Sequence, residues 1–134
     1  MKRSPVLRAL SSEHHTALVL ARHTLAVTGD EVDKAWEEVV QRFEVALEPH
    51  FLQEETLLLP ALAQIGEADL VERTLSEHAR LRALVHELEH DAENLRLFGE
   101  LLHAHIRFEE RELFATAQAR LPEFSEDKSP TKIR

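Results

Sequence analysis

The sequence predicts an all-α protein, an antiparallel up-down-up-down four-helix bundle, and three observations support this prediction. Apolar residues, mostly Leu and Ala, make up 43% of the 134-residue chain. Only three Gly and five Pro are present, too few to supply the turns of a β-sheet. Apolar residues recur with a helical period in four segments, whose short connections imply antiparallel neighbours. These helices form one domain, residues 1–121, followed by a polar segment, 122–134, that we expect to be a mobile C-terminal tail.

Capping and stop signals delimit the four predicted helices, which span residues 12–28, 30–65, 67–91 and 94–121. Ser12 and Asp30 are the candidate N-caps of the first two helices. Proline interrupts the second helix twice, so we expect a bend near Pro49 and a break or restart at Pro60.

The two halves of the chain resemble each other. HFLQEETLLLPA at 50–61 aligns with HIRFEERELFAT at 105–116, and both contain H-x-x-x-E-E. SEHHTALV at 12–19 shares Ser-Glu-His with the segment that starts at residue 76. The first two helices therefore echo the last two in the same order, which predicts two equivalent half-sites facing each other in the core.

Six polar side chains are predicted to face the bundle axis. Because an α-helix turns about 100° per residue, one histidine of each helix falls within its apolar stripe. In the second helix, for example, the stripe includes Leu57 and Ala61. In the two H-x-x-x-E segments, a glutamate one turn later faces the same space as its histidine. The predicted inward residues are His14, His50, Glu54, His78, His105 and Glu109.

The chain has nine histidines, and the other five are expected at the flanks of the helices or in solvent. They are His15, His23, His86, His90 and His103. His15 stays open as a further ligand because it neighbours His14. Another carboxylate, from Glu13, Glu55 or Glu77, is a second way to complete the site.

Six inward polar groups are costly in an apolar core unless they share a partner. The stripes offer no inward Lys or Arg, and the chain has no Cys, so the donors are imidazole and carboxylate alone. These donors suit iron, manganese, cobalt or zinc. Two glutamates among four histidines predict a carboxylate-bridged pair of ions, each with two histidines and open positions. A ferritin-like site is disfavoured because its E-x-x-H spacings, Glu87 with His90 and Glu100 with His103, fall on outward faces.

The motifs SEHH, HFLQEETLLLPAL, LSEHARL and HIRFEERELF resemble those of the hemerythrin-like, or HHE cation-binding, family over residues 10–121. The resemblance implies an oxo- or hydroxo-bridged pair of iron ions held by the six inward residues, with zinc or manganese as alternative metals. Two departures stand out. Hemerythrins carry H-x-x-x-H in the third helix, where this chain has Thr74 at the earlier position. Their fourth-helix carboxylate is an Asp five residues after its histidine, whereas Glu109 follows at four.

We therefore expect a hemerythrin-like protein that binds iron and a small ligand: dioxygen, nitric oxide or peroxide. Sensing, carriage or iron handling without catalysis is the favoured role. The alternative is a di-iron enzyme of peroxide or nitric oxide detoxification, peroxidase- or catalase-like or nitric oxide-reducing. A net charge of −9 argues against a nucleic-acid partner. No secretory signal or membrane-length apolar run is found, so we expect no membrane partner and a cytoplasmic location.

Overall fold

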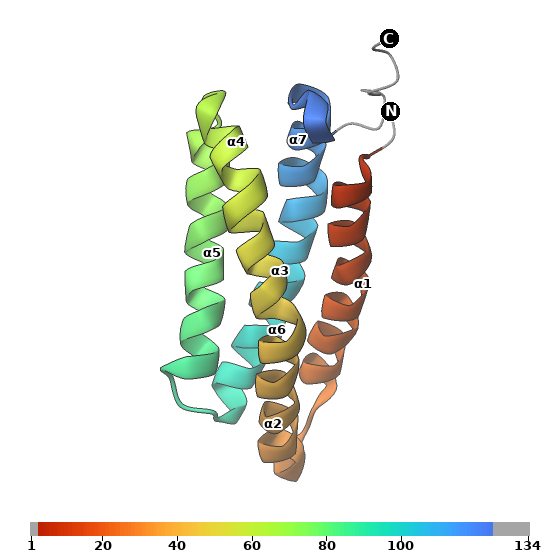
Figure 1. Cartoon of the computed structure of the whole chain (residues 1–134). Coiled ribbons are helices and arrows are strands. Elements are labelled where there is room, and N and C mark those ends of the chain that lie inside the picture. Colours follow the sequence, from red (N-terminus) through yellow and green to blue (C-terminus); the bar gives the residue numbers. More distant parts are fainter. Residues whose placement is uncertain (1–2, 125–134) are drawn as a thin grey trace.

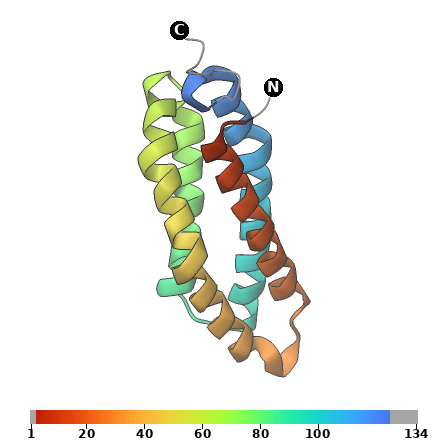
Figure 2. The ribbon, with the colours of Figure 1, turned by 45° about the vertical axis from the view of Figure 1, so that its right-hand side comes forward.

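The computed structural model describes residues 3–124, which form a bundle of four helical rods (Figure 1). The rods are, in chain order, α1 (Pro5–Ala26), the path from α2 (Val32–Arg42) through α3 (Glu48–Gln53) to α4 (Leu59–Gln64), α5 (Ala68–His86), and the path from α6 (Ala92–Phe108) to α7 (Phe114–Arg120). Successive rods run in opposite directions, as the second view also shows (Figure 2). The predicted fold class is confirmed.

The first helix begins earlier than predicted. The Ser4 hydroxyl accepts a hydrogen bond from the backbone N–H of Leu7 at 3.2 Å, and Pro5 occupies the first helical turn. A serine cap followed by proline is a strong helix start, because proline lacks the N–H that would otherwise be unpaired there. The prediction that Ser12 caps this helix is wrong, since Ser12 lies inside it.

Three wider, π-helical turns lie within the long rods: η2 (Phe43–Leu47), η3 (Glu54–Leu58) and η4 (Glu109–Leu113). The helical path is not broken at Pro60, but the α-helix restarts there, because α4 begins at Leu59 after the π turn η3. Pro49 and Pro60 each lie in the first turn of an α-helical segment that directly follows a π turn. A proline at that position costs little, because it interrupts no regular α-helical hydrogen bond.

The π turn η3 shifts which residues of the second rod face the core. A regular helix would place Leu57 inward, but its side chain is 50% exposed, whereas Leu58 is 0% exposed. Leu62 is also fully buried, and Ala61 is only partly buried. Because a π turn holds one more residue than an α turn, the buried stripe moves on by one residue. The prediction that Leu57 faces the core is wrong for this reason.

Two apolar clusters fill the bundle, one towards each end. The cluster near the termini includes Leu10 and Leu58, and the other includes Ala17 and Leu47. His14 lies between Leu10 and Ala17 on α1, so a polar layer separates the clusters along the axis. This layer contains the candidate site.

The packed chain extends beyond the predicted domain end at residue 121. Phe124, in the short 3₁₀ turn η5 (Pro122–Phe124), belongs to the cluster near the termini. Its backbone carbonyl accepts a hydrogen bond from the N–H of Ser4 at 3.2 Å. Residues 125–134 of the predicted tail lie outside the described residues.

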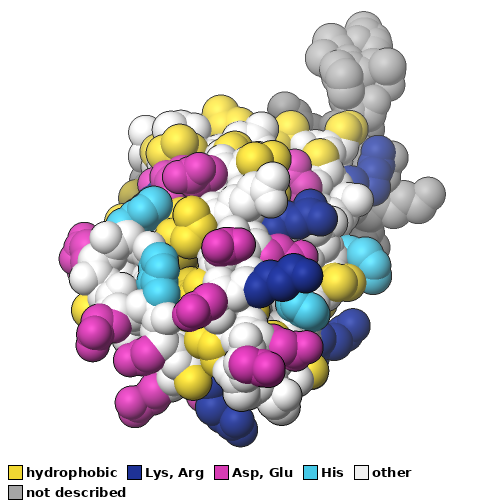
Figure 3. Space-filling model, turned by 90° about the horizontal axis from the view of Figure 1, so that it is seen from below, with side chains coloured by type: hydrophobic (Ala, Val, Ile, Leu, Met, Phe, Trp, Pro, Cys, Tyr) yellow, Lys and Arg dark blue, Asp and Glu magenta, His cyan; other side chains and the backbone are white. Residues whose placement is uncertain are grey.

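At the opposite end of the bundle, acidic side chains lie among scattered basic and apolar ones (Figure 3). Across residues 3–124, no helix combines the length and the apolar character needed to cross a bilayer.

Candidate metal centre

The six inward residues predicted from the sequence meet in the polar layer between the two apolar clusters. Each is at most 3% exposed. Each of the four rods supplies one histidine, and the two glutamates are the first residues of the π turns η3 and η4. The residues are His14, His50, Glu54, His78, His105 and Glu109.

Their ligand atoms form two groups that share both glutamates. One group adds His14 and His50, the other adds His78 and His105, and within each group the atoms lie within 4.8 Å of one another. Each carboxylate directs one oxygen to each group. Glu54 Oε2 lies 2.9 Å from His50 Nε2, and Glu54 Oε1 lies 3.0 Å from His78 Nε2. Glu109 Oε1 lies 2.8 Å from His14 Nε2, and Glu109 Oε2 lies 2.9 Å from His105 Nε2.

Most of these short contacts lack the angles of a hydrogen bond. Buried atoms without a hydrogen-bond partner include Nε2 of His50, His78 and His105, both carboxylate oxygens of Glu54, and Oε2 of Glu109. An unsatisfied buried polar group costs about 1–3 kcal/mol. Several such atoms aimed at shared points suit a bound cation, which accepts their lone pairs together.

The pKa values show how protons balance the charges when no cation is bound. Burial and the neighbouring Glu109 carboxylate raise the pKa of Glu54 well above its usual value. Burial also raises the pKa of Glu109, but the positive charge of His105 and the close polar atoms of His105 and Glu54 outweigh it and hold that pKa well below normal. For His105, burial lowers the pKa, yet Glu109 and Glu77 raise it to about 10. Cation binding must therefore displace protons from the site.

An outer ring of four carboxylates holds the four histidines. Each histidine donates its Nδ1–H to a glutamate of the preceding rod, and the fourth rod closes the ring onto the first. The pairs are Glu13 with His50 at 2.7 Å, Glu55 with His78 at 2.7 Å, Glu77 with His105 at 2.6 Å, and Glu110 with His14 at 2.6 Å. Such contacts fix the tautomer and turn every Nε2 towards the centre.

Three carboxylates of the outer ring are those that the sequence offers as further ligands. Glu13, Glu55 and Glu77 contact the outer nitrogens of the histidines and are absent from both ligand groups. Sequence reasoning did not assign these contacts or the role of Glu110. The sequence does contain a pattern that could have indicated these contacts. In the repeated Ser-Glu-His and Glu-Glu motifs, each outer glutamate is the direct neighbour of an inward residue.

Arginines pair with three of the four outer carboxylates. Arg82 contacts Glu55, and its pKa rises as the guanidinium pairs with Glu48 and Glu55. Arg73 contacts Glu77 at 2.9 Å.

Arg3 contacts Glu110 at 2.6 Å. Although burial raises the pKa of Glu110, hydrogen bonds from His14 and Arg3 lower it to about 2. Glu13 differs from these carboxylates, because no arginine of residues 3–124 pairs with it and its side chain is 53% exposed.

Two phenylalanines cover the histidine rings. Phe51 stacks on His78 with ring centroids 3.9 Å apart, and Phe114 stacks on His14 at 5.0 Å. These contacts fill the space beside the rings with apolar surface and restrict their rotation.

The remaining five histidines lie where the sequence predicts. Four are exposed and one, His103, is half-buried. None belongs to either ligand group, so His15 does not join the centre. The outward E-x-x-H pairs are likewise absent from both groups, which agrees with the argument against a ferritin-like site.

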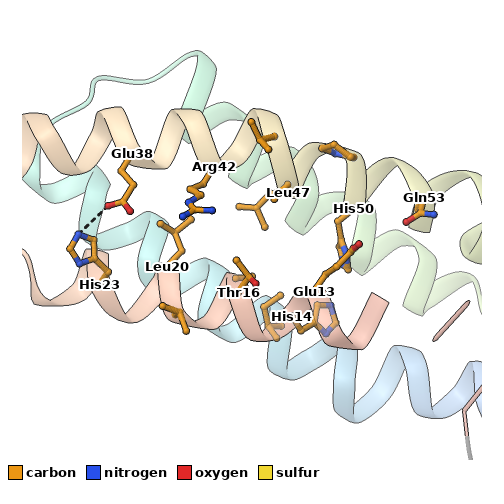
Figure 4. A pocket seen from close by; sticks show the side chains of 16 residues that line it. Glu13, His14, Thr16, Leu20, His23, Glu38, Arg42, Leu47, His50 and Gln53 are labelled. Carbon is orange, nitrogen blue, oxygen red and sulfur yellow. Dashed lines mark hydrogen bonds and ion pairs between the residues drawn. The ribbon is translucent and has the colours of Figure 1, made fainter. Parts of the chain in front are cut away.

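A pocket opens beside one half of the centre, between α1 and the rod from α2 to α3 (Figure 4). Its volume is about 510 Å³, and its lining includes His14 and His50 but neither His78 nor His105. The two ligand groups therefore differ in their access to this pocket.

Comparison with known proteins agrees with this geometry. The chain matches the hemerythrin HHE cation binding domain over residues 6–117, which include all six inward residues. No significant match was found among the curated proteins or the solved structures. Cation binding is the property that this domain description gives, and the buried His/Glu cluster fits it. Since the match covers most of the sequence, the chain belongs to the hemerythrin HHE cation-binding domain family.

Proposed function

We propose that the chain binds two iron ions, bridged by Glu54 and Glu109. His14 and His50 would bind one ion, and His78 and His105 the other. The observation that carries this proposal is the pair of ligand groups sharing both carboxylates, with one oxygen of each carboxylate directed to each group.

The distances suit coordination. Two ligand atoms about 2.1 Å from one ion, at a right angle to each other, lie about 3.0 Å apart. The four contacts between a histidine Nε2 and the nearest oxygen of Glu54 or Glu109 measure 2.8, 2.9, 3.0 and 2.9 Å. Imidazole and carboxylate donors suit iron, and zinc and manganese are the alternatives.

Four protein ligands leave open positions on a six-coordinate ion, where dioxygen, nitric oxide or peroxide would bind. The third rod supplies no second imidazole: the Thr74 hydroxyl is buried one turn before His78 and donates to the Leu70 carbonyl at 2.8 Å. When bound, the iron pair supplies redox and Lewis-acid chemistry. The protein residues hold the ions, orient the imidazoles and limit water around them. A role in sensing, carriage or iron handling follows.

Metal content tests this proposal. Protein loaded anaerobically with ferrous iron and passed through a desalting column is expected to retain about two ions per chain. A Glu54→Ala/Glu109→Ala variant is expected to retain none, while His90→Ala, which changes an exposed histidine outside both groups, keeps both ions. Retention of two ions by the double variant, or of none by the unmodified chain, would refute the proposal. Elemental analysis of protein purified without added metal identifies the native metal.

The alternative is an enzyme of peroxide or nitric oxide detoxification, which the pocket beside His14 and His50 favours because it offers a route to that half of the centre. An enzyme is expected to turn over hydrogen peroxide when iron-loaded and to lose this activity in His105→Ala. A stable dioxygen adduct without turnover of either substrate would exclude the enzyme and leave the binding role.

A further inference from the structure

The pocket between α1 and the rod from α2 to α3 is a groove that is larger than a diatomic molecule requires. Its lining runs from residue 13 to residue 23 on α1 and from residue 38 to residue 53 on the second rod. Its volume of about 510 Å³ falls within the range of small-molecule sites. Buried Ala17, Leu20 and Leu47 line its inner wall, and exposed Val19 and Val45 extend the apolar surface to the rim. An organic molecule with an aliphatic part would bury that part here.

The charged groups of the groove are arranged unevenly along its length. At one end, His23 contacts Glu38 at 3.2 Å, so this carboxylate has a partner. Arg42 reaches from α2 towards Leu20 on α1 (Figure 4) and forms no ion pair with residues 3–124. At the other end, Glu13 accepts a hydrogen bond from His50 Nδ1 at 2.7 Å, so each of these two carboxylates has a histidine partner. An anionic head group is therefore attracted to Arg42, a cation of the lining that forms no ion pair with residues 3–124.

The distance along the groove limits the ligand length. Arg42 and His50 are eight residues apart on one rod, which corresponds to about 12 Å at the α-helical rise of 1.5 Å per residue and to slightly less across the wider turn η2. We infer that the groove binds a straight-chain aliphatic carboxylate of about eight to ten carbon atoms, with its head group at Arg42 and its methyl end beside His14 and His50. The methyl end would adjoin two of the proposed iron ligands, but binding at Arg42 and along the apolar wall does not depend on the proposed function.

Calorimetry on the metal-free chain tests binding with butanoate, hexanoate, octanoate and decanoate. Affinity is expected to rise about fourfold with each added methylene until the groove is filled. Octanol is expected to bind more weakly than octanoate, and octylammonium more weakly still. Equal affinity across the series, or no binding at all, would overturn the inference.

Two pairs of variants locate the site. Arg42→Gln is expected to weaken octanoate binding about two- to fivefold and to leave octanol binding unchanged, since it removes one exposed charge contact. Arg80→Gln, at an exposed position on α5 outside the groove, is expected to change neither. Ala46→Phe fills the groove and should abolish binding of both ligands, whereas Ala63→Phe outside it should not. Octanoate affinity equal to that of the unmodified chain in both Arg42→Gln and Ala46→Phe would place the ligand elsewhere.

The orientation is tested by nuclear magnetic resonance on the cobalt(II)-loaded protein with octanoate. Paramagnetic relaxation is expected to be stronger at the terminal methyl than at the methylene beside the carboxylate. The opposite order would show that the head group faces the metal, and would refute the role of Arg42. Failure to retain cobalt would count against the metal site, while the calorimetry still decides whether the groove binds carboxylates.

Discussion

The register shift at η3 makes a quantitative prediction for two adjacent leucines. Leu58 is fully buried in the cluster near the termini, and Leu57 is 50% exposed. Replacing leucine by alanine removes three carbon atoms, worth about 2.4 kcal/mol of transfer free energy when fully buried and about half of that when half exposed. Leu58→Ala also leaves a cavity, so its total cost is expected at about 3–5 kcal/mol. Leu57→Ala is expected to cost about 1 kcal/mol or less.

Urea unfolding of the metal-free chain, followed by circular dichroism, measures both values. The dependence of the unfolding free energy on urea concentration should match that of the unmodified protein. The differences in stability then appear as shifts in the urea concentration at the unfolding midpoint. An equal or larger loss for Leu57→Ala would refute the π turn at Glu54–Leu58. An uninterrupted helix, with Leu57 inward as the sequence period suggests, would then describe the rod better.

Further predictions concern the centre and its outer ring. Glu77→Gln, which alters the acceptor for His105 Nδ1–H, is expected to weaken metal affinity about 10- to 100-fold in competition with a chelator, whereas Glu112→Gln on the exposed face should not change it. Because the pKa of His105 is raised to about 10, its protonated form stabilises the metal-free fold fully below its unfolded value of about 6.5, and this stability is lost as the pH rises through about 10. The thermal midpoint of the metal-free chain should therefore fall over that range, and a rising midpoint would contradict the charge balance. Dialysis of the iron-loaded chain at about pH 4.5 is expected to release the iron, since protons compete for the imidazoles; unchanged iron content would argue against histidine ligation.

The sequence predicts the fold class and the convergence of six side chains because both depend on short-range helical periodicity. His105 and Glu109 are one turn apart, so the sequence alone places them on one face. A π turn changes the register by one residue, and the local composition of Glu54–Leu58 does not distinguish it from an α turn. For this reason the direction of Leu57 was predicted wrongly, while that of Glu54, at the start of the turn, agrees with the structure.

Contacts between rods are harder to predict than directions within one rod. The hydrogen bond of Glu110 with His14 joins the last rod to the first, and its partners are 96 residues apart in the chain. Helical periodicity places Glu110 only beside the stripe of its own helix, at its flank. Which neighbouring side chain it meets depends on the order and spacing of the rods, and the sequence period does not contain that information.

The outer ring gives a physical reason for the internal repeat of the sequence. In each half of the chain, the Ser-Glu-His motif supplies one inward histidine and, through its glutamate, an acceptor for the histidine of the next rod. The Glu-Glu pair supplies one inward carboxylate and an acceptor for the rod after it. The repeat therefore makes the two halves equivalent in ligands and outer contacts, but not in their surroundings. Within residues 3–124, arginine pairs with the other three outer carboxylates and not with Glu13, which lines the pocket that His14 and His50 also line. A ligand that enters through this pocket thus meets the half of the centre where one carboxylate of the outer ring, Glu13, is held by no arginine of residues 3–124.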